Sequence, residues 1–318
     1  MSQLTNLSVL GSGVLGGQIA WHSASKGKNV VVLDNSAEAI ARCKTTHQHY
    51  AQIYQQELGL DDQQIELTQS RLSYTTDLAA AVAEADLVVE AVPEVPEVKL
   101  SVYHSLAPLL PAHTLLASNS STFLPQDFAD ATGRPEKFCA MHFANLIWRM
   151  NIVEIMAHPH TAPETLVQAT EFGIEIGMRP IPVQKQQNGY VINTWFVALL
   201  NAAQSLVTNG VSTAEDVDRS YLICNKGASM GPMALMDVVG METAFNVLQY
   251  WGTVNQDEQM LANANFIQNQ FLDKGLYGLQ TGEGYYKYPE PSYQQADFLA
   301  VPDISEAPAL AARAVLSE

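Results

Sequence analysis

The chain has 318 residues, of which 47% are hydrophobic and only 15% charged, so it can bury the cores of two domains. Its net charge of −17 disfavours nucleic acid and anionic membrane surfaces, and no apolar run approaches the about 20 residues of a membrane helix. The three cysteines form no CxxC pair, and the N-terminus has no secretory or transit pattern, so we expect a cytoplasmic protein without a metal site.

The first part of the chain alternates short apolar runs with helical patterns. Strands are predicted at 6–11, 29–34, 71–76, 86–92 and 114–120, and helices from near Val14, at 77–85 and at 98–110. This alternation predicts a parallel sheet covered by helices on both faces, which is an α/β, Rossmann-type doubly wound domain.

Two further apolar runs, 138–144 and 151–157, are joined too closely for a helical crossover, so we expect an antiparallel pair. A helix at 163–177 and a strand at 179–184 follow. The pattern then becomes helical, beginning with 188–210. We therefore predict a Rossmann domain over 1–185 and an all-α domain over 186–318, with a loosely packed tail after Tyr288.

A glycine loop follows the first predicted strand. The pattern Gly11-x-Gly13-x-x-Gly16 opens a helix, and Asp34 ends the next strand eighteen residues later. The helix N-terminus can bind the phosphates of a dinucleotide, and a carboxylate that binds the ribose repels a 2′-phosphate, which favours NAD over NADP. A glycine turn that binds nothing is the alternative. The predicted cofactor contacts are Gly11, Gly13, Val14, Leu15, Gly16 and Asp34.

One titratable residue lies in each strand of the predicted antiparallel pair. His142 and Glu154 both sit among apolar neighbours, where either one alone would be costly to bury. If residue 142 pairs with residue 154, the carboxylate holds one ring nitrogen and leaves the other as a general base. A purely structural buried pair is the alternative.

The turn after the strand at 114–120 is rich in hydroxyl groups. Because ligands bind at the carboxyl ends of strands in such sheets, Ser120, Ser121 and Thr122 can bind a substrate oxygen. The same residues also suit a turn that caps a helix at Leu124.

Taken together, these stretches resemble the 3-hydroxyacyl-CoA dehydrogenase family from Leu7 to Tyr288. The resemblance rests on the glycine loop and on "DLVVEAVPE", "SNSS", "HF-N…M-IVEI", "NGYVIN", "GPMALMDVVG" and "TGEGYYKY". It implies fatty acid metabolism, hydride transfer between NAD and C3 of a 3-hydroxy or 3-oxo acyl substrate, and a homodimer formed by the helical domain, which also contributes to the substrate site. It further implies these roles: His142 as base, Glu154 as its partner, Ser121 and Asn193 on the substrate, and Glu94, Lys99, Asn119 and Asn145 on the cofactor.

The sequence departs from the family pattern in three places. The residues after the histidine are Phe143-Ala144-Asn145-Leu146 in place of FFNP, a wording similar to diketoreductases, and Gln280 replaces a cofactor-contacting lysine. In 37–70, where the family has a basic segment for CoA, two cations face five carboxylates. Tyr50 and Glu57 occupy the positions of a CoA-contacting serine and lysine.

These departures leave more than one function open. A 3-oxo ester reductase, a dicarbonyl reductase or a 3-hydroxy acid dehydrogenase on the same scaffold would not need CoA. A non-catalytic NAD-binding structural protein is the alternative from another class.

Overall fold

The computed structural model describes residues 4–225, 227–296 and 298, so most of the tail after Tyr288 lies outside the described residues. The chain forms two compact units, Met1–Thr194 and a second that begins at Trp195. The predicted boundary after residue 185 precedes this division by nine residues, which include Asn193.

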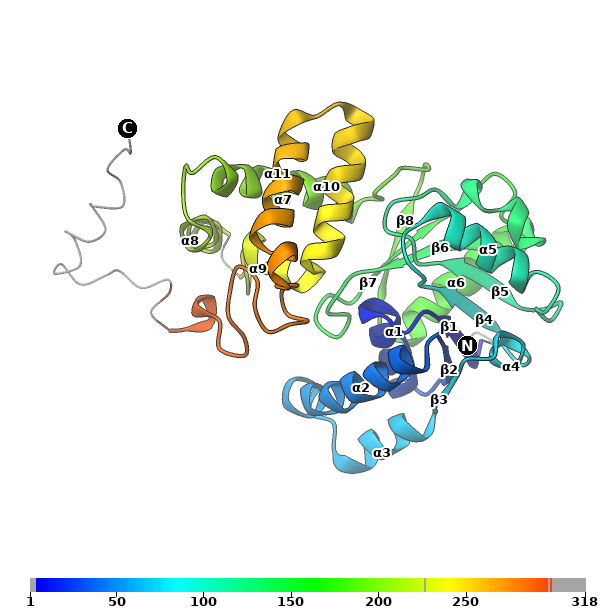
Figure 1. Ribbon diagram of the computed structural model, residues 1–318. Coiled ribbons are helices and arrows are strands. Elements are labelled where there is room, and N and C mark those ends of the chain that lie inside the picture. The colour runs from blue at the N-terminus through cyan, green and yellow to red at the C-terminus, as the bar shows by residue number, and fades with distance from the viewer. Residues whose placement is uncertain (1–3, 226, 297, 299–318) are drawn as a thin grey trace. The chain divides into compact units, whose positions relative to one another are not determined.

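The first unit is built on one sheet of eight strands (Figure 1). The strands lie in the order β3-β2-β1-β4-β5-β6-β7-β8. All neighbours are parallel except β6 and β7, as predicted. The strands are β1 Asn6–Leu10, β2 Asn29–Leu33, β3 Leu72–Thr75, β4 Leu87–Glu90, β5 Leu115–Ser118, β6 Phe138–Phe143, β7 Ile152–Met156 and β8 Arg179–Val183.

Helices cover both faces of this sheet, which confirms the predicted α/β class. Alternate strand residues point to opposite faces, so Leu7 and Val9 pack with α1 and α6, while Leu10 packs with α4 and α5. The helices of this unit are α1 Val14–Ser25, α2 Ala37–Leu58, α3 Asp62–Ser70, α4 Leu78–Val82, α5 Pro96–Leu106 and α6 Pro163–Glu175. Helix α5 starts two residues before the predicted position, because proline is well accommodated in a first turn.

Helices α2 and α3 form a hairpin beside α1 (Figure 1). The side chain of Ser36 caps α2, Gly59 ends it in the left-handed conformation, and Asp61 forms a capping box with Gln64 at the start of α3. Both ends of α2 and the start of α3 therefore have specific caps.

The second unit is all-α, as predicted. Its longest helices are α7 Ile192–Thr208, whose first three residues belong to the first unit, α8 Ala214–Cys224, α9 Pro232–Val239, α10 Met241–Asn255 and α11 Glu258–Gln270. Short 3-10 turns lie at Leu272–Lys274 and Ser292–Gln294 in this unit, and at Pro125–Asp127, Asp130–Thr132 and Pro135–Lys137 in the first unit. Helix α7 begins later than predicted because Gly189 and Tyr190 have φ angles of 76° and 56°, which a helix does not permit.

Two buried carboxylates hold the second unit together. Asp218 accepts the backbone N–H groups of Met233 and Ala234 at the start of α9. Asp237 accepts those of Tyr285 and Tyr286 at 2.8 and 2.9 Å. The hydroxyl of Tyr286 also donates to Asp218 at 2.7 Å, so one tyrosine joins both carboxylates.

This arrangement predicts a stability that depends on pH. Burial raises the pKa of Asp237 from an ordinary value of 3.8 to about 6, although its hydrogen bonds lower it. The folded state therefore binds this proton more tightly than the unfolded state, and stability from this group rises as pH falls from 7.5 to 4.5. The gain is about 3 kcal/mol at most.

Urea unfolding of the wild type and of Asp237→Asn at several pH values measures this effect, because the difference between them isolates Asp237. We expect the free energy of unfolding of the wild type to rise relative to that of the variant as the pH falls towards 4.5. Asp273→Asn, at an exposed site, is the control and leaves the pH dependence unchanged. A difference that is flat or that falls with acid contradicts the prediction.

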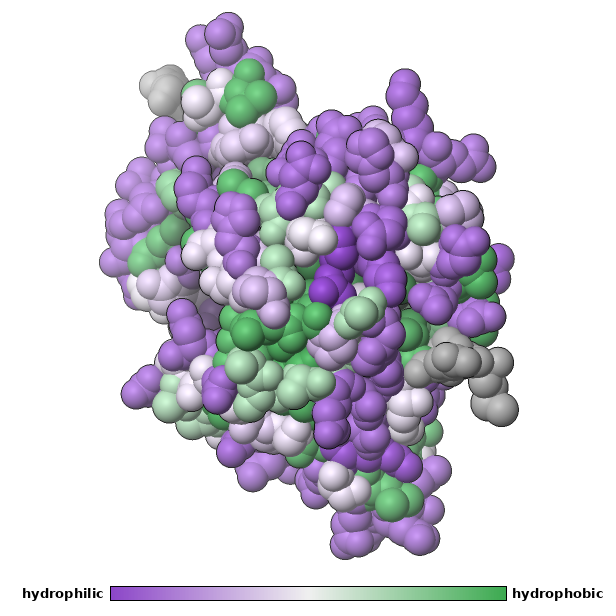
Figure 2. Space-filling view, turned by 90° about the vertical axis from the view of Figure 1, so that its right-hand side faces the viewer, coloured by the Kyte–Doolittle hydropathy of each residue, from purple (hydrophilic) through white to green (hydrophobic). Residues whose placement is uncertain are grey.

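The face of the molecule in Figure 2 is mainly polar. Purple polar side chains predominate on it, and green apolar side chains form a larger area near its middle and smaller areas elsewhere. A mixture of this kind is ordinary for a folded protein. No helix in the described part of the chain is both long and apolar enough to cross a membrane.

Candidate active site

The glycine loop packs tightly at two glycines and leaves open space at the third. Gly11 has a φ of 103°, and a Cβ on it would lie 2.4 Å from the carbonyl oxygen of Ala91. A Cβ on Gly16 would lie 2.0 Å from the carbonyl oxygen of Gly11. By contrast, a Cβ on Gly13 would meet no atom within 4 Å, so the space over the N-terminus of α1 is open.

Asp34 lies beside this loop at the end of β2. One carboxylate oxygen accepts the N–H and hydroxyl of Ser12 at 2.9 and 2.7 Å, and the other accepts the N–H of Ser36 at 3.1 Å. Burial alone would raise the pKa of Asp34, but these hydrogen bonds hold it below its ordinary value. The carboxylate is thus ionised at neutral pH and can accept further hydrogen bonds.

The antiparallel pair brings His142 and Glu154 together in the predicted register. The two residues are direct partners across β6 and β7, and Nδ1 of His142 lies 2.8 Å from Oε2 of Glu154. Both side chains are buried. Since the carboxylate holds Nδ1–H, the unprotonated nitrogen of the neutral ring is Nε2, and no described residue bonds to it.

The second oxygen of Glu154 is also satisfied. Oε1 accepts the N–H groups of Val191 and Ile192 at 2.8 and 2.9 Å, at the start of α7. A carboxylate with 0% exposure is tolerated here because three donors surround it.

The hydroxyl-rich turn after β5 is fixed by Glu94. Its Oε1 accepts the hydroxyl of Ser120 at 2.5 Å and the N–H groups of Ser121 and Thr122, each at 3.0 Å. The side-chain amide of Asn193 donates to the carbonyl of Ser121 at 3.0 Å. The structure thus brings Ser121 and Asn193 together, and both lie in the first unit.

Lys99 is buried beneath this turn with 1% exposure. Its ammonium lies 2.7 Å from Glu90 and 3.0 Å from Glu94. Glu90 also accepts the hydroxyls of Tyr103 and Ser118 at 2.6 and 2.8 Å. Sequence reasoning missed Glu90, although a carboxylate at the end of the apolar run "DLVVE" carries the same signal as Glu154.

Two asparagines lie near the end of β6. Asn119 accepts the N–H of Phe143, the residue after the histidine, at 2.9 Å. Oδ1 of Asn145 is buried and has no partner among the described residues, so it remains available for a ligand. Next to it, Gln18, also missed from the sequence, accepts the N–H of Leu146 at 2.7 Å.

Val14 and Leu15 occupy the first turn of α1. Val14 is 53% exposed, whereas Leu15 packs against the core under the sheet. Together with the open space at Gly13, the ionised Asp34 and the unpartnered Asn145, this turn fits a dinucleotide whose phosphates meet the helix N-terminus.

Glu57 near the end of α2 binds the loop between β6 and β7. Its carboxylate accepts two hydrogen bonds from Arg149, both at 2.6 Å, and one from the indole of Trp148 at 3.0 Å. The Trp148 ring also packs on Tyr50, with centroids 5.5 Å apart. Both positions where the resemblance implies CoA contacts are therefore occupied by contacts within the protein.

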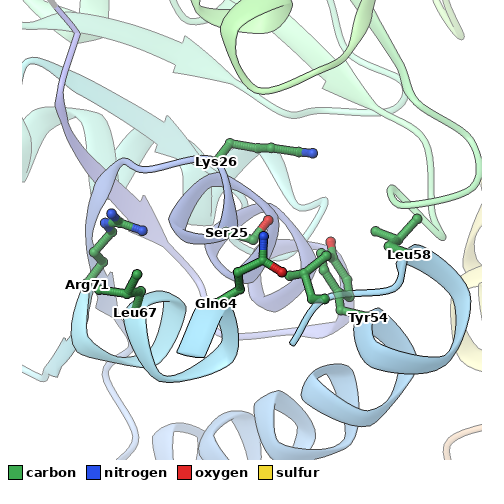
Figure 3. Close-up of a pocket in the computed structure, with 8 residues that line it drawn as sticks. Ser25, Lys26, Tyr54, Leu58, Gln64, Leu67 and Arg71 are labelled. Atoms are coloured by element: carbon green, nitrogen blue, oxygen red, sulfur yellow. The ribbon is translucent and has the colours of Figure 1, made fainter. Parts of the chain in front are cut away.

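A hollow of about 180 Å³ lies away from this site, between α1, α2 and α3 (Figure 3). In Figure 3, Arg71 lies at the left with its side chain pointing upward, and Lys26 lies at the top with its side chain extending to the right. They do not converge on one ligand, so the hollow is not our candidate site. Nε2 of His158 contacts the carbonyl of Pro135 at 3.0 Å, and the described residues contain no group of three or more side chains that could hold a metal ion.

Comparison with known proteins identifies the family of this chain. The family model described as 3-hydroxyacyl-CoA dehydrogenase, NAD binding domain, matches residues 6–187, and that of the C-terminal domain matches residues 189–288. Hydroxyacyl-coenzyme A dehydrogenase from Sus scrofa is 30% identical over 89% of this chain and 91% of its own. A probable 3-hydroxybutyryl-CoA dehydrogenase from Deinococcus radiodurans is 31% identical over 88% and 99%.

Solved structures give the same result. One solved structure is a diketoreductase, described with the words "Substrate-directed dual catalysis of dicarbonyl compounds by diketoreductase". It is 40% identical to this chain, with a TM-score of 0.77, and the match covers 91% of this chain and 100% of its own. The (S)-3-hydroxybutyryl-CoA dehydrogenase of Ralstonia eutropha is 25% identical, with a TM-score of 0.73 over 91% and 100%. The chain therefore belongs to the 3-hydroxyacyl-CoA dehydrogenase family of NAD-dependent oxidoreductases.

Proposed function

We propose that this protein catalyses the reversible reduction of a 3-oxo compound to the 3-hydroxy compound, with His142 as the proton-transferring group. The observation that carries the proposal is the 2.8 Å contact of Nδ1 with a fully buried carboxylate, which leaves Nε2 for the substrate. NAD supplies or accepts the hydride when it is bound.

In the oxidation direction, Nε2 of His142 takes the proton of the 3-hydroxyl group as the C3–H bond breaks. Glu154 holds the reactive tautomer and stabilises the imidazolium that forms. The hydroxyl of Ser121 and the amide of Asn193 hold the substrate oxygen, and Glu94 fixes the turn that carries Ser121. In the reduction direction, His142 returns the proton to the 3-oxo oxygen.

The cofactor site proposed here lies at the carboxyl ends of β1 and β2. The N-terminus of α1, with Gly13, Val14 and Leu15, binds the pyrophosphate, and Asp34 binds the adenosine ribose. Oδ1 of Asn145, which has no partner among the described residues, can accept a hydrogen bond from the cofactor. Lys99, buried between two carboxylates, stabilises the Glu94 turn from below.

A substrate without CoA is the second candidate, and the contacts of Glu57 favour it. Glu57 stands where the resemblance implies a lysine, so this position provides no positive charge for a phosphate of CoA. Its carboxylate is ion-paired with Arg149 instead. The 40% identity with a diketoreductase points to the same class, a small dicarbonyl compound or 3-oxo ester. The rival is a 3-oxoacyl-CoA whose phosphates stay in solvent.

The test compares kcat/KM for acetoacetyl-CoA with that for a 3-oxo ester such as ethyl acetoacetate, at one NADH concentration. We expect the ester to be used at least as well as the thioester. A preference for the thioester of about 1000-fold, or about 4 kcal/mol of transition-state binding, contradicts the second candidate and leaves the reaction type intact. No turnover of either compound contradicts the reaction type.

Three wider features of the protein are also proposals. We propose a homodimer formed by the helical unit, because Trp195, Tyr250 and Val254 are each about half exposed there. The free cysteines of the described chain suit the cytoplasm. A 3-hydroxyacyl substrate would place the enzyme in fatty acid metabolism.

A further inference from the structure

Tyr190 lies against the imidazole ring of His142. The ring centroids are 4.9 Å apart, and the ring planes are inclined by 35°, so the tyrosine presents much of its face to the histidine. Tyr190 is 1% exposed. It packs in a small cluster with Ala140 and Met156, which are strand neighbours of the dyad.

The backbone of Tyr190 adopts a conformation that needs a local cause. Its φ of 56° is uncommon for a residue with a bulky side chain and costs energy. Such conformations persist where the surrounding contacts determine them, and they gather at functional sites. Here the preceding residue, Gly189, donates to the carbonyl of Thr122 at 3.4 Å.

The residues that follow Tyr190 are fixed by the dyad itself. Oε1 of Glu154 accepts the N–H groups of Val191 and Ile192, while Oε2 holds His142. One carboxylate thus fixes both the histidine and the segment that places the tyrosine over it. His142 is held at its edge by Glu154 and on one face by Tyr190.

We infer that Tyr190 is a positioning residue for the proton-transferring histidine. Its ring stops the imidazole from turning away from the substrate, and the negative face of the ring stabilises the imidazolium that forms during oxidation. The hydroxyl contributes little, because its contact with the carbonyl of Phe123 is long, at 3.4 Å. This inference rests on His142 being the proton-transferring group.

Two variants separate the ring from the hydroxyl. Tyr190→Phe keeps the ring, and we expect its kcat to stay within about twofold of wild type. Tyr190→Leu removes the ring, and we expect kcat to fall about 10-fold or more, because a misplaced catalytic group costs up to about 100-fold. The KM for the 3-oxo substrate and the Kd for NADH, measured by fluorescence titration, stay near wild type.

Tyr54→Leu is the matched control for loss of a buried tyrosine ring. Tyr54 is also 1% exposed in the first unit, but its hydroxyl bonds to His22, and its ring does not contact the dyad. We expect the control to lower the melting temperature without lowering kcat. An equal loss of kcat in Tyr54→Leu and Tyr190→Leu would overturn the inference, since it would indicate a general packing effect.

A double variant distinguishes this inference from the proposed function. If Tyr190 acts through His142, Tyr190→Leu causes no further loss of kcat in a His142→Gln background. If the two substitutions instead lower kcat by factors that multiply, Tyr190 does not act through His142, and the inference is overturned. That result leaves the proposed role of His142 unaffected. A His142→Gln variant with wild-type kcat overturns the proposed function, and the inference with it.

Discussion

Replacing His142 by glutamine lowers kcat by about 100-fold or more, because the enzyme loses the group that transfers the substrate proton. Glutamine has a similar size and can still meet Glu154 with its amide, so the buried carboxylate is not left without a donor. Steady-state rates of NADH oxidation with a 3-oxo substrate measure the loss.

The control for this variant is cofactor binding. The glycine loop and Asp34 make no contact with His142, so the Kd for NADH should remain within about threefold of wild type, and the melting temperature should change little. Near-native turnover with intact binding would show that another group transfers the proton.

Replacing Glu154 by glutamine should be at least as damaging, for a reason of tautomers. The side-chain oxygen of glutamine can keep the N–H groups of Val191 and Ile192, which leaves its NH₂ group facing Nδ1 of His142. Nδ1 must then accept, so the proton moves to Nε2 and the substrate meets a donor where it needs an acceptor. In the serine protease triad, replacing the aspartate by asparagine gives the wrong histidine tautomer and lowers kcat about 10⁴-fold. We expect a loss of about 1000-fold here.

The measurement is kcat in the oxidation direction, where Nε2 must accept the proton. Glu175→Gln, which neutralises a carboxylate paired with Lys28 at 2.6 Å elsewhere in the first unit, is the control and should leave kcat unchanged. If Glu154→Gln loses stability but keeps kcat, Glu154 is structural and does not set the tautomer.

Local patterns were sufficient to predict the sheet and the pairing of the dyad. The eight apolar runs have strand lengths, and the short gap between 144 and 151 permits only an antiparallel pair, so His142 could be placed opposite Glu154. The glycine spacing is similarly local, because the close approach of Gly16 to the carbonyl of Gly11 lies within one loop of the chain.

Contacts between distant segments could not be predicted in this way. Glu57 and Arg149 are 92 residues apart, and the sequence around either residue does not identify the other as its partner. Lys99 looks like a free cation in the sequence, and its burial depends on Glu90 at the end of a neighbouring strand. Tyr190 reads as part of a helix, and only its backbone conformation places its ring over His142.

Deuterium transfer tests the central claim most directly. NADH with deuterium at both C4 positions of the nicotinamide is incubated with the enzyme and a 3-oxo substrate, either the ester or the CoA thioester, and the product is examined by mass spectrometry and NMR. The account predicts one deuterium at C3 for each NADH consumed, and a rate of this transfer that is about 100-fold lower or more in His142→Gln. A product without deuterium at C3, or no consumption of NADH with either substrate, would contradict it.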